Sequence, residues 1–327
     1  MSQPTILHQI HFPIQKEIDE LNNRCKTIFQ HSEPTVNAVL SDVNLLEGKK
    51  LRPCMVFLSA GIAGKINHVT QITAFGFELL HYASLLHDDV IDNGHKRHNQ
   101  PTLNTLWSNK IAVLAGDYLL SECMNVIDKA GHQKLLSKLL TITKTMTYGE
   151  LLQLSKSDNT ATDEQEYMKI IQYKTASLIS ACFEMGVASC ASDEKMINEW
   201  KKFGEEVGII FQLKDDLLDY QPNNLSQKDM HKDIKEHKIT LPFIIALQQT
   251  PESEKEKMWN LYKNHNGKES DIQTIIHLVT ERGGINYTEN LIDKKTNQCL
   301  YFVQQQKDSD YKQSLLQLIQ FIRNRNF

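Results

Sequence analysis

Residues 69–92 read VTQITAFGFELLHYASLLHDDVID, and this stretch decides the expected fold. Apolar side chains recur in it at helical spacing, for example at Phe75, Leu79, Leu86 and Val90. Such spacing matches one face of an α-helix, and the stretch is too long for an ordinary strand. The pattern therefore predicts a long helix that buries one face and ends in a cluster of carboxylates.

Helical patterns of the same kind continue along most of the chain, and residues that interrupt helices are scarce. Glycine and proline number 14 and 8 among 327 residues, which is well below their average usage of about 12%. Convincing alternating strands are absent, and the breaks between helical patterns are short. We expect an all-α fold, with roughly ten to thirteen helices in a single domain over residues 1–327.

Charge and cysteine usage limit the class of ligand and the compartment. The formal charge of −4 offers no broad basic field for nucleic acid, so an anionic ligand must meet locally placed lysine and arginine. No apolar run approaches the length of about 20 residues that a membrane span needs. The six cysteines form no C-x-x-C pair, which favours a reducing cytoplasm over a disulfide framework or a zinc site.

The long helix ends in the sequence HDDVID, whose acidic residues are Asp88, Asp89 and Asp92. Asp88 and Asp92 are four residues apart, so they share a helix face, and His81 projects along the same line. Carboxylates this close repel one another unless a cation bridges them, and hard oxygen ligands suit Mg²⁺ that also binds a diphosphate. The alternative for one such cluster alone is an acidic helix end exposed to water.

A second cluster repeats the spacing about 125 residues later, as DDLLD at Asp215, Asp216 and Asp219. It also ends a helical pattern, before the turn at Pro222. Two helices could therefore present carboxylates to one cavity, as helical bundles do for metals. A pair of clusters of this kind can hold a metal-bound diphosphate.

Basic residues accompany both clusters. Lys49 and Arg52 are three apart at a predicted helix start, where free backbone N–H groups also attract anions, so they indicate a diphosphate pocket. The other basic candidates are Arg97, Lys174 beside Thr175, Lys228, Lys232 and Lys238. Any one of these alone is more typical of a solvated surface, but together they supply the cations that diphosphate transfer needs.

These residues resemble the trans-isoprenyl diphosphate synthases, or polyprenyl synthetases, from about Leu46 to the C-terminus. The resemblance is carried by residues 48–53, 81–92, 97–102, 116–117, 149–153, 174–176, 211–220 and 238–242, in the family's order and near its spacing. It implies an isoprenoid synthase-like helical bundle around a central cavity, and a homodimer. The implied reaction joins isopentenyl diphosphate to an allylic prenyl diphosphate by ionisation, condensation and elimination.

The resemblance also implies a role for each matching residue. Mg²⁺ would be held by Asp88, Asp92 and Asp215, with Asp89, Asp216 and Asp219 in support. The allylic diphosphate would be bound by Arg97, Lys174, Thr175, Gln212, Lys228 and Lys238, and isopentenyl diphosphate by Lys49, Arg52 and His81. His98 stands where the family usually has a second arginine, and family glycines are replaced by Glu47, Asn99, His231 and His237.

Product length is expected to be set beneath the first acidic helix. Short-chain members commonly carry a bulky aromatic four or five residues before the first aspartate, where this chain has Ser84 and Ala83. The cavity should then continue past Leu80 to Phe77, which lies eleven residues and about 16 Å before Asp88. We therefore predict a medium- or long-chain product of 30 to 40 carbons. Alternatively, Phe77 packs in the core, and Tyr82 or Met124 closes the tunnel.

The same residues are compatible with other functions. The chain could be a short-chain farnesyl or geranylgeranyl diphosphate synthase, or a non-catalytic partner subunit of a heteromeric synthase. A class I terpene cyclase would normally carry Asn/Asp-x-x-Ser/Thr-x-x-x-Glu at its second metal site, which the sequence from Asp215 to Asp219 does not match. Partner subunits commonly lose their acidic motifs, whereas both are intact here.

Overall fold

The computed structural model describes residues 3–28, 33–43, 45, 48–97, 100–156, 163–221 and 231–326, and the structural statements below concern these residues. Within them the chain is all-α, as predicted, except for one short ribbon. In that ribbon β1 (Lys96–Arg97) pairs antiparallel with β2 (Gln100–Pro101). None of the described helices has both the length and the apolar character that crossing a bilayer requires.

The chain divides into two compact units. The first unit comprises Met1–Thr143, Ala181–Lys201 and Lys307–Leu315. The second comprises Lys144–Ser180, Lys202–Gln306 and Leu316–Phe327. The expectation of one domain stays a prediction.

The described residues form more helical segments than the ten to thirteen expected, because several of the helices are short. The first unit contains α1 (Gln3–His11), η1 (Phe12–Ile14), α2 (Gln15–Thr27), α3 (Pro34–Ser41), α4 (Leu51–Ala63), α5 (His68–Ile91), α6 (Leu103–Leu106) and α7 (Asn109–Lys129). The second contains α9 (Glu164–Ile171), η2 (Gln172–Ala176), α12 (Lys232–Lys235), α13 (Leu241–Gln249), α14 (Glu252–Asn264), α15 (Glu269–Glu281) and α16 (Gly284–Gln304). Residues of both units occur in α8 (Gln133–Lys156), α10 (Ser177–Ala188), α11 (Glu194–Leu218) and α17 (Asp310–Asn324). Four-residue helices such as α6 and α12 are too short for periodicity to reveal.

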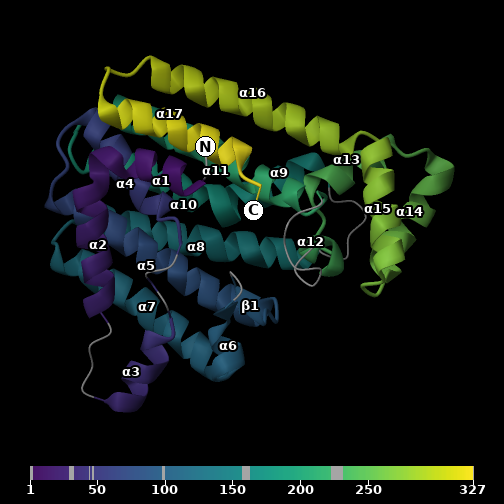
Figure 1. Cartoon of the computed structure of the whole chain (residues 1–327), viewed down its shortest axis with the longest axis horizontal. Helices are drawn as coiled ribbons and strands as arrows, with labels where there is room; N and C mark the ends of the chain where they lie inside the picture. Colours follow the sequence, from purple (N-terminus) through teal and green to yellow (C-terminus); the bar gives the residue numbers. More distant parts are fainter. Residues whose placement is uncertain are drawn as a thin grey trace. The chain divides into compact units, whose positions relative to one another are not determined.

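The helix α5 is the centre of the first unit and begins within a residue of the predicted start. Asn67 caps it, because its side chain accepts hydrogen bonds from the N–H groups of Val69 and Thr70 while the Thr70 hydroxyl bonds back to Asn67. Its buried face packs on α7 (Figure 1). Gly76 permits this approach, since a Cβ there would lie 2.7 Å from Ile127. Burying each large apolar side chain of this interface contributes about 1.5–3 kcal/mol.

In the second unit, an apolar cluster supports the segment that carries Lys238 and Thr240. Phe243 of α13 stacks on Tyr262 of α14, with ring centroids 3.9 Å apart. The Tyr262 hydroxyl donates to the backbone carbonyl of Lys238, and the Tyr220 hydroxyl lies 3.0 Å from that of Thr240. Helices α13 to α16 pack together around this cluster (Figure 1). The loop carrying Lys238 is thereby fixed to a buried core.

Candidate active site

The first acidic motif lies at the C-terminal end of α5, in the first unit. Asp88 is in the last turn of the helix, and the N–H of Asp92 donates to the Asp88 carbonyl at 2.8 Å. Both side chains are partly exposed. Partial exposure suits carboxylate ligands of Mg²⁺, because this ion keeps several of its water molecules.

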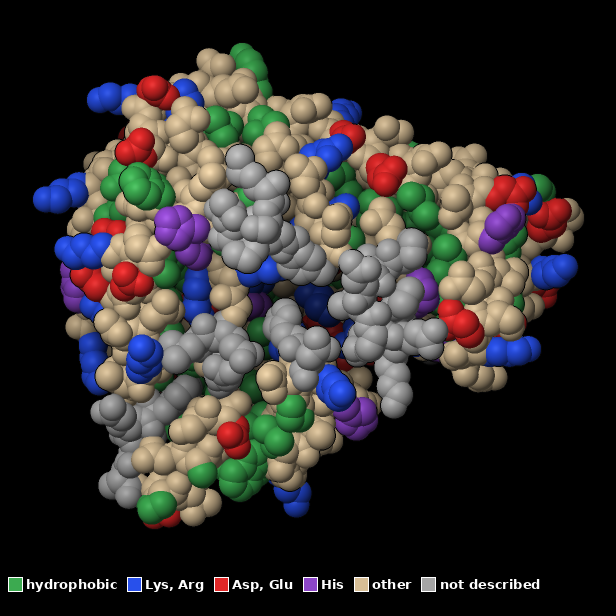
Figure 2. Space-filling view, viewed as in Figure 1, with side chains coloured by type: hydrophobic (Ala, Val, Ile, Leu, Met, Phe, Trp, Pro, Cys, Tyr) green, Lys and Arg blue, Asp and Glu red, His purple; other side chains and the backbone are tan. Residues whose placement is uncertain are grey.

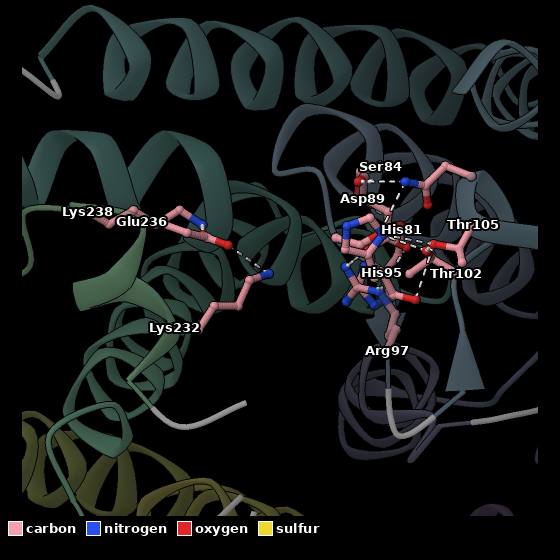
Figure 3. A network of polar contacts seen from close by, with 12 residues as sticks. His81, Ser84, Asp89, His95, Arg97, Thr102, Thr105, Lys232, Glu236 and Lys238 are labelled. Atoms are coloured by element: carbon pink, nitrogen blue, oxygen red, sulfur yellow. Dashed lines mark hydrogen bonds and ion pairs between the residues drawn. The ribbon is translucent and has the colours of Figure 1, made fainter. Parts of the chain in front are cut away.

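Asp89, in the same motif, is buried and held by Arg97. The guanidinium places Nη2 2.8 Å from Oδ1 of Asp89 and Nε 3.2 and 3.3 Å from the two carboxylate oxygens. Arg97 lies on β1, and the Thr102 hydroxyl ties this ribbon back to the Gly94 carbonyl at 2.7 Å (Figure 3). Because the Asp89 carboxylate is directed at Arg97, its role in supporting the metal ligands stays a prediction.

Further cations lie at the start of α4. Lys50 immediately precedes the helix and Arg52 is its second residue, as the sequence predicts. Burial, together with the positive charges of Arg52, Arg97 and Lys50, holds the pKa of His81 well below 6.5. The His81 ring is therefore neutral near pH 7, and it can bind an anion only by donating a hydrogen bond. The first unit thus brings three predicted basic residues, Arg52, His81 and Arg97, into one neighbourhood.

The neighbouring Gly116-Asp117 pair orients His87, the residue before the first aspartate. A Cβ on Gly116 would lie 2.4 Å from Nε2 of His87, so only glycine leaves room for that ring. Nε2 of His87 is 3.3 Å from Oδ1 of Asp117 and 3.3 Å from the Val113 carbonyl. The ring is consequently clamped against α7 beside the acidic motif.

The second motif, at the end of α11 in the second unit, is organised by a row of hydrogen bonds. The Thr175 hydroxyl donates to the Gln212 amide oxygen at 2.7 Å, and the Gln212 amide nitrogen donates to Oδ1 of Asp216 at 2.7 Å. The Tyr167 hydroxyl donates to Oδ2 of the same carboxylate. The structure therefore joins Thr175, Gln212 and Asp216 as one group, and it adds Tyr167, which sequence reasoning missed.

Asp216 is buried, and the half-buried carboxylates of Asp219 and Asp233 lie near it. Burial raises the pKa of Asp216 to about 7, and the negative charge of Asp233 adds to the effect. The same two causes raise the pKa of Asp219 to about 7, although Asp219 accepts a hydrogen bond from the N–H of Ile234 at 3.0 Å. Partial loss of hydration also raises the pKa of Asp233, whose side chain is 27% exposed. Sequence reasoning missed Asp233, and its only signal was an acidic residue between the second motif and Lys238.

Asp215 has a different partner. Nη2 of Arg325 lies 2.8 Å from Oδ1 of Asp215, and the guanidinium carbon lies 3.7 Å from the centre of the Phe211 ring. Arg325 is only 6% exposed. Nothing in the local sequence of the motif points to this arginine, because it comes from the C-terminal segment after α17.

Lys174 is presented by an irregular helical turn. Residues Gln172–Ala176 form a π-helix, η2, a feature that often occurs at functional sites. Gly149 of α8 allows close packing there, since a Cβ would lie 2.6 Å from the Lys174 nitrogen. The Lys174 ammonium forms an ion pair with Glu150 and lies 3.0 Å from the Gln153 amide oxygen. The motif residues 149–153 and 174–176 therefore hold one another in position.

Lys238 is paired with acidic neighbours. Its ammonium lies 2.8 Å from Glu236 (Figure 3) and 3.9 Å from Asp233. His231 and His237, at family glycine positions, have φ angles of 58° and 56°, the left-handed region that glycine enters easily. His237 offsets this strain by bonding the Tyr262 carbonyl at 2.9 Å. The replacements therefore keep the backbone conformation that a glycine would allow.

Some predicted residues remain untested. His98, Lys228, Glu47 and Asn99 lie outside the described residues. Phe77, Leu80 and Ala83 are buried on α5, and the Ser84 hydroxyl donates to the His81 carbonyl at 2.8 Å. Burial is compatible both with a tunnel floor and with ordinary core packing, so the chain-length roles stay predictions.

The carboxylates fit a magnesium ion that a diphosphate helps to bind. Among the described side chains, no three His, Cys, Asp or Glu converge closely enough to bind a metal alone. Mg²⁺ in phosphate-binding enzymes commonly uses one or two carboxylates, with phosphate oxygens and water completing the shell. The crowded, proton-binding pair Asp216 and Asp219 also indicates a place where a cation is favourable.

Comparison with known proteins places this site in context. A family model described as Polyprenyl synthetase matches residues 33–279. An all-trans-nonaprenyl-diphosphate synthase (geranyl-diphosphate specific) of Rhodobacter capsulatus is 31% identical over 281 residues, which cover 85% of each chain. The octaprenyl diphosphate synthase of Haemophilus influenzae is 28% identical over 281 residues, covering 86% of this chain and 85% of that protein.

Solved structures of polyprenyl and decaprenyl synthases have a similar fold. A decaprenyl diphosphate synthase from Rhodobacter capsulatus superposes with a TM-score of 0.91 at 28% identity, covering 98% of this chain and 99% of that one. A polyprenyl synthase from Caulobacter crescentus, complexed with calcium and isoprenyl diphosphate, gives 0.89 at 26% identity and covers 98% of both chains. The all-α fold expected from the sequence is thereby confirmed.

Proposed function

This chain belongs to the polyprenyl synthetase family, and from that premise we propose that it joins isopentenyl diphosphate to an allylic prenyl diphosphate with the help of Mg²⁺. Its relatives include nonaprenyl, octaprenyl and decaprenyl diphosphate synthases, which support a trans-prenyltransferase of the medium- or long-chain type. The observation that carries the proposed chemistry is the close grouping of the buried Asp216 with the half-buried Asp219 and Asp233. A site of this kind favours a bound cation.

The proposed reaction needs cationic groups at each diphosphate. Arg97, Lys174, Thr175, Gln212, Lys228 and Lys238 bind the allylic diphosphate, and Lys49, Arg52 and His81 bind isopentenyl diphosphate. His98, at the position of the family's second arginine, would contribute to binding isopentenyl diphosphate. The bound arrangement stabilises charge that develops as the allylic C–O bond breaks. The isopentenyl double bond then attacks the allylic carbocation, and the released diphosphate accepts the final proton.

The acidic residues Asp88, Asp92 and Asp215, supported by Asp89, Asp216 and Asp219, would hold Mg²⁺. When bound, Mg²⁺ supplies Lewis-acid stabilisation of the departing diphosphate. The hydrogen-bonded row from Thr175 through Gln212 to Asp216 keeps the second motif in one orientation before substrate arrives. Such prior ordering lowers the cost of assembling the reactive arrangement.

The proposed product is a polyprenyl diphosphate of 30 to 40 carbons, with Phe77 as the floor of the elongation cavity. Phe77 is fully buried on α5, eleven residues before Asp88, and the smaller Ala83 and Ser84 lie between them. Phe77→Ala should open space and shift the products longer. Chromatography of the dephosphorylated products tests this, and an unaltered distribution would show that Phe77 packs without limiting the chain.

We also propose a cytoplasmic homodimer. The first unit exposes apolar side chains that are close together in sequence at the end of α6, directly after it and on α7, namely Leu106, Trp107, Val113 and Leu114. Figure 2 shows hydrophobic side chains gathered in this part of the surface. A second copy is the expected partner, because contiguous exposed apolar residues mark interaction surfaces. Sedimentation of the wild type and of Leu114→Lys tests the dimer.

The free thiols of the six cysteines are compatible with the cytoplasm.

One experiment tests the central proposal. The protein, purified alone, is incubated with radiolabelled isopentenyl diphosphate, farnesyl diphosphate and MgCl₂, and the dephosphorylated products are separated by chain length. Elongation beyond 20 carbons supports the proposal. Products that stop at 15 or 20 carbons indicate a short-chain synthase, cyclic hydrocarbons indicate a terpene cyclase, and no incorporation indicates a non-catalytic partner subunit.

A further inference from the structure

A buried lysine closes the loop that leads into α4. Lys50 is only 6% exposed, and its backbone has the left-handed φ of 52°, which residues with side chains adopt rarely. Its ammonium donates to the Leu45 carbonyl, five residues earlier, and to the Glu78 carboxylate at 3.2 Å. It also lies 3.4 Å from the Tyr82 hydroxyl and 5.1 Å from the centre of that ring. One side chain therefore joins the loop to α5.

Glu78 is the other half of this contact. It lies in the middle of the apolar helix α5, and the side chains of Glu78 and Lys50 are 5% and 4% exposed. A buried ion pair of this kind commonly contributes no more stability than two apolar side chains of the same size, because both charges lose their water. Its presence in the core therefore calls for a role other than stability. Neither residue has a part in the reaction proposed above.

The position of the pair indicates that role. Lys50 lies between Lys49 and Arg52 in the sequence, at the start of α4. Glu78 lies three residues before His81 on α5, so the two share a helix face. The pair therefore ties the segment that carries Lys49 and Arg52 to the helix face that carries His81.

We propose that Lys50 and Glu78 are positioning residues for isopentenyl diphosphate, which hold Lys49 and Arg52 in register with His81 without touching the substrate. This inference rests on the proposed function, since it concerns the same diphosphate pocket. The left-handed backbone at Lys50 is maintained by the contacts of its ammonium to Leu45 and Glu78. If these contacts are lost, the loop relaxes and the neighbouring cations move away from their common target.

The test separates binding from turnover. Lys50→Met should raise the KM for isopentenyl diphosphate about tenfold, because small displacements of binding groups have effects of this size or larger. The kcat and the KM for farnesyl diphosphate should change less than about threefold. Calorimetry with isopentenyl diphosphate alone, without an allylic substrate, should show the same loss of affinity. Lys50→Arg, which can still donate to both partners, should restore most of it.

Two further variants keep the test decisive. Glu78→Gln preserves shape while removing the charge, so it gives the answer if Lys50→Met fails to fold, and it should weaken isopentenyl diphosphate binding in the same direction. Lys138→Met is the matched control, because Lys138 forms a lysine–glutamate pair with Glu184 in the same unit. It should leave isopentenyl diphosphate affinity unchanged. A purely structural role for Lys50 predicts instead less folded protein, with unaltered KM and binding affinity in the folded fraction.

Lys49→Ala and Arg52→Ala distinguish the inference from the proposed function. If these two variants bind isopentenyl diphosphate as tightly as the wild type, the proposed pocket itself is wrong. If they lose affinity while Lys50→Met and Glu78→Gln retain it, the pocket stands and the positioning role is overturned. Loss of affinity in all four variants, with the Lys138→Met control unaffected, supports both.

Discussion

The two acidic motifs have the same spacing but different electrostatic surroundings. In the first, Asp89 is buried against Arg97, so its charge is compensated by the protein itself. In the second, Asp216 is buried near Asp233 and receives hydrogen bonds from the neutral groups of Tyr167 and Gln212, and its pKa is raised to about 7. With an identical D-D-x-x-D spacing, the middle aspartate of the first motif therefore has an arginine as counter-ion, and that of the second takes up a proton or an added cation.

The largest expected effect comes from removing the leading carboxylate of either motif. Asp88→Ala and Asp215→Ala should each lower kcat by several orders of magnitude, because each removes a proposed Mg²⁺ ligand. Thermal unfolding of Asp88→Ala should change little, since that side chain is partly exposed, whereas Asp215→Ala should lose some stability because it removes a partner of the buried Arg325. Steady-state rates at saturating magnesium measure the effect.

A matched control for these variants is Asp128→Ala, whose side chain is exposed on α7. It should retain normal turnover. Near-normal turnover in either Asp88→Ala or Asp215→Ala would remove that motif from the reaction. Loss of activity in only one of the two would show that the motifs differ in function as well as in surroundings.

The second expected effect is a pH dependence of folding stability, which arises from the second motif and not from the first. The pKa of Asp216 and that of Asp219 rise from 3.8 to about 7 on folding. The stability that these groups contribute is therefore present below about pH 4 and lost as pH rises to about 7. Metal-free protein should be less stable at pH 7.5 than at pH 5, by up to about 5 kcal/mol from these two groups.

Asp216→Asn tests this pH dependence, because asparagine resembles the protonated acid at every pH. Chemical unfolding of metal-free protein should then show a smaller loss of stability between pH 5 and pH 7.5 than in the wild type. Asp128→Asn, on the exposed face of α7, is the control. An equal slope for Asp216→Asn and wild type would show that the carboxylates of the second motif are not proton-binding in the folded protein.

A smaller effect is expected from the hydroxyl that supports Asp216. Tyr167→Phe removes one hydrogen bond to the carboxylate and should lower kcat/KM about tenfold, as the loss of one hydrogen bond to a charged group typically does. That hydrogen bond lowers the pKa of Asp216, so the acidic limb of the rate profile should move to higher pH. Tyr301→Phe, exposed on α16, is the matched control. A reduced rate with an unmoved pH limb would contradict the coupling between Tyr167 and Asp216.

Sequence reasoning recovered the features that local spacing determines. The helix expected over residues 69–92 is α5, His68–Ile91, because Asn67 caps it and its apolar face repeats regularly. The start of α4 at Leu51 was likewise expected from the basic cluster. Contacts between distant segments were not predictable, and they include Tyr167 with Asp216 and Lys50 with Glu78. Such pairs depend on how helices pack, for which a single sequence contains no local signal.

The contact of Arg325 with Asp215 could not be predicted from the sequence either, because it joins distant segments. Replacing Arg325 is expected to have the smallest effect of the variants discussed. Its guanidinium lies 2.8 Å from Asp215, 110 positions away in the sequence, so the second motif does have one cation, supplied by the C-terminal segment. Arg325 and Mg²⁺ would use the same carboxylate. Arg325→Gln should therefore lower the magnesium concentration for half-maximal activity by about threefold, as expected for losing one partly screened charge pair.

Binding measurements make this last test independent of catalysis. Calorimetric titration of Arg325→Gln with MgCl₂ and inorganic diphosphate should show tighter metal-dependent binding than the wild type. Arg323→Gln is the matched control, because Arg323 pairs with Asp293 on α16 and not with the motif. Weaker binding in Arg325→Gln would mean that the arginine orients Asp215 for the metal instead of competing with it. The second motif would then resemble the first, with an arginine that belongs to its working arrangement, and the contrast between the two would reduce to Asp216 and Asp219.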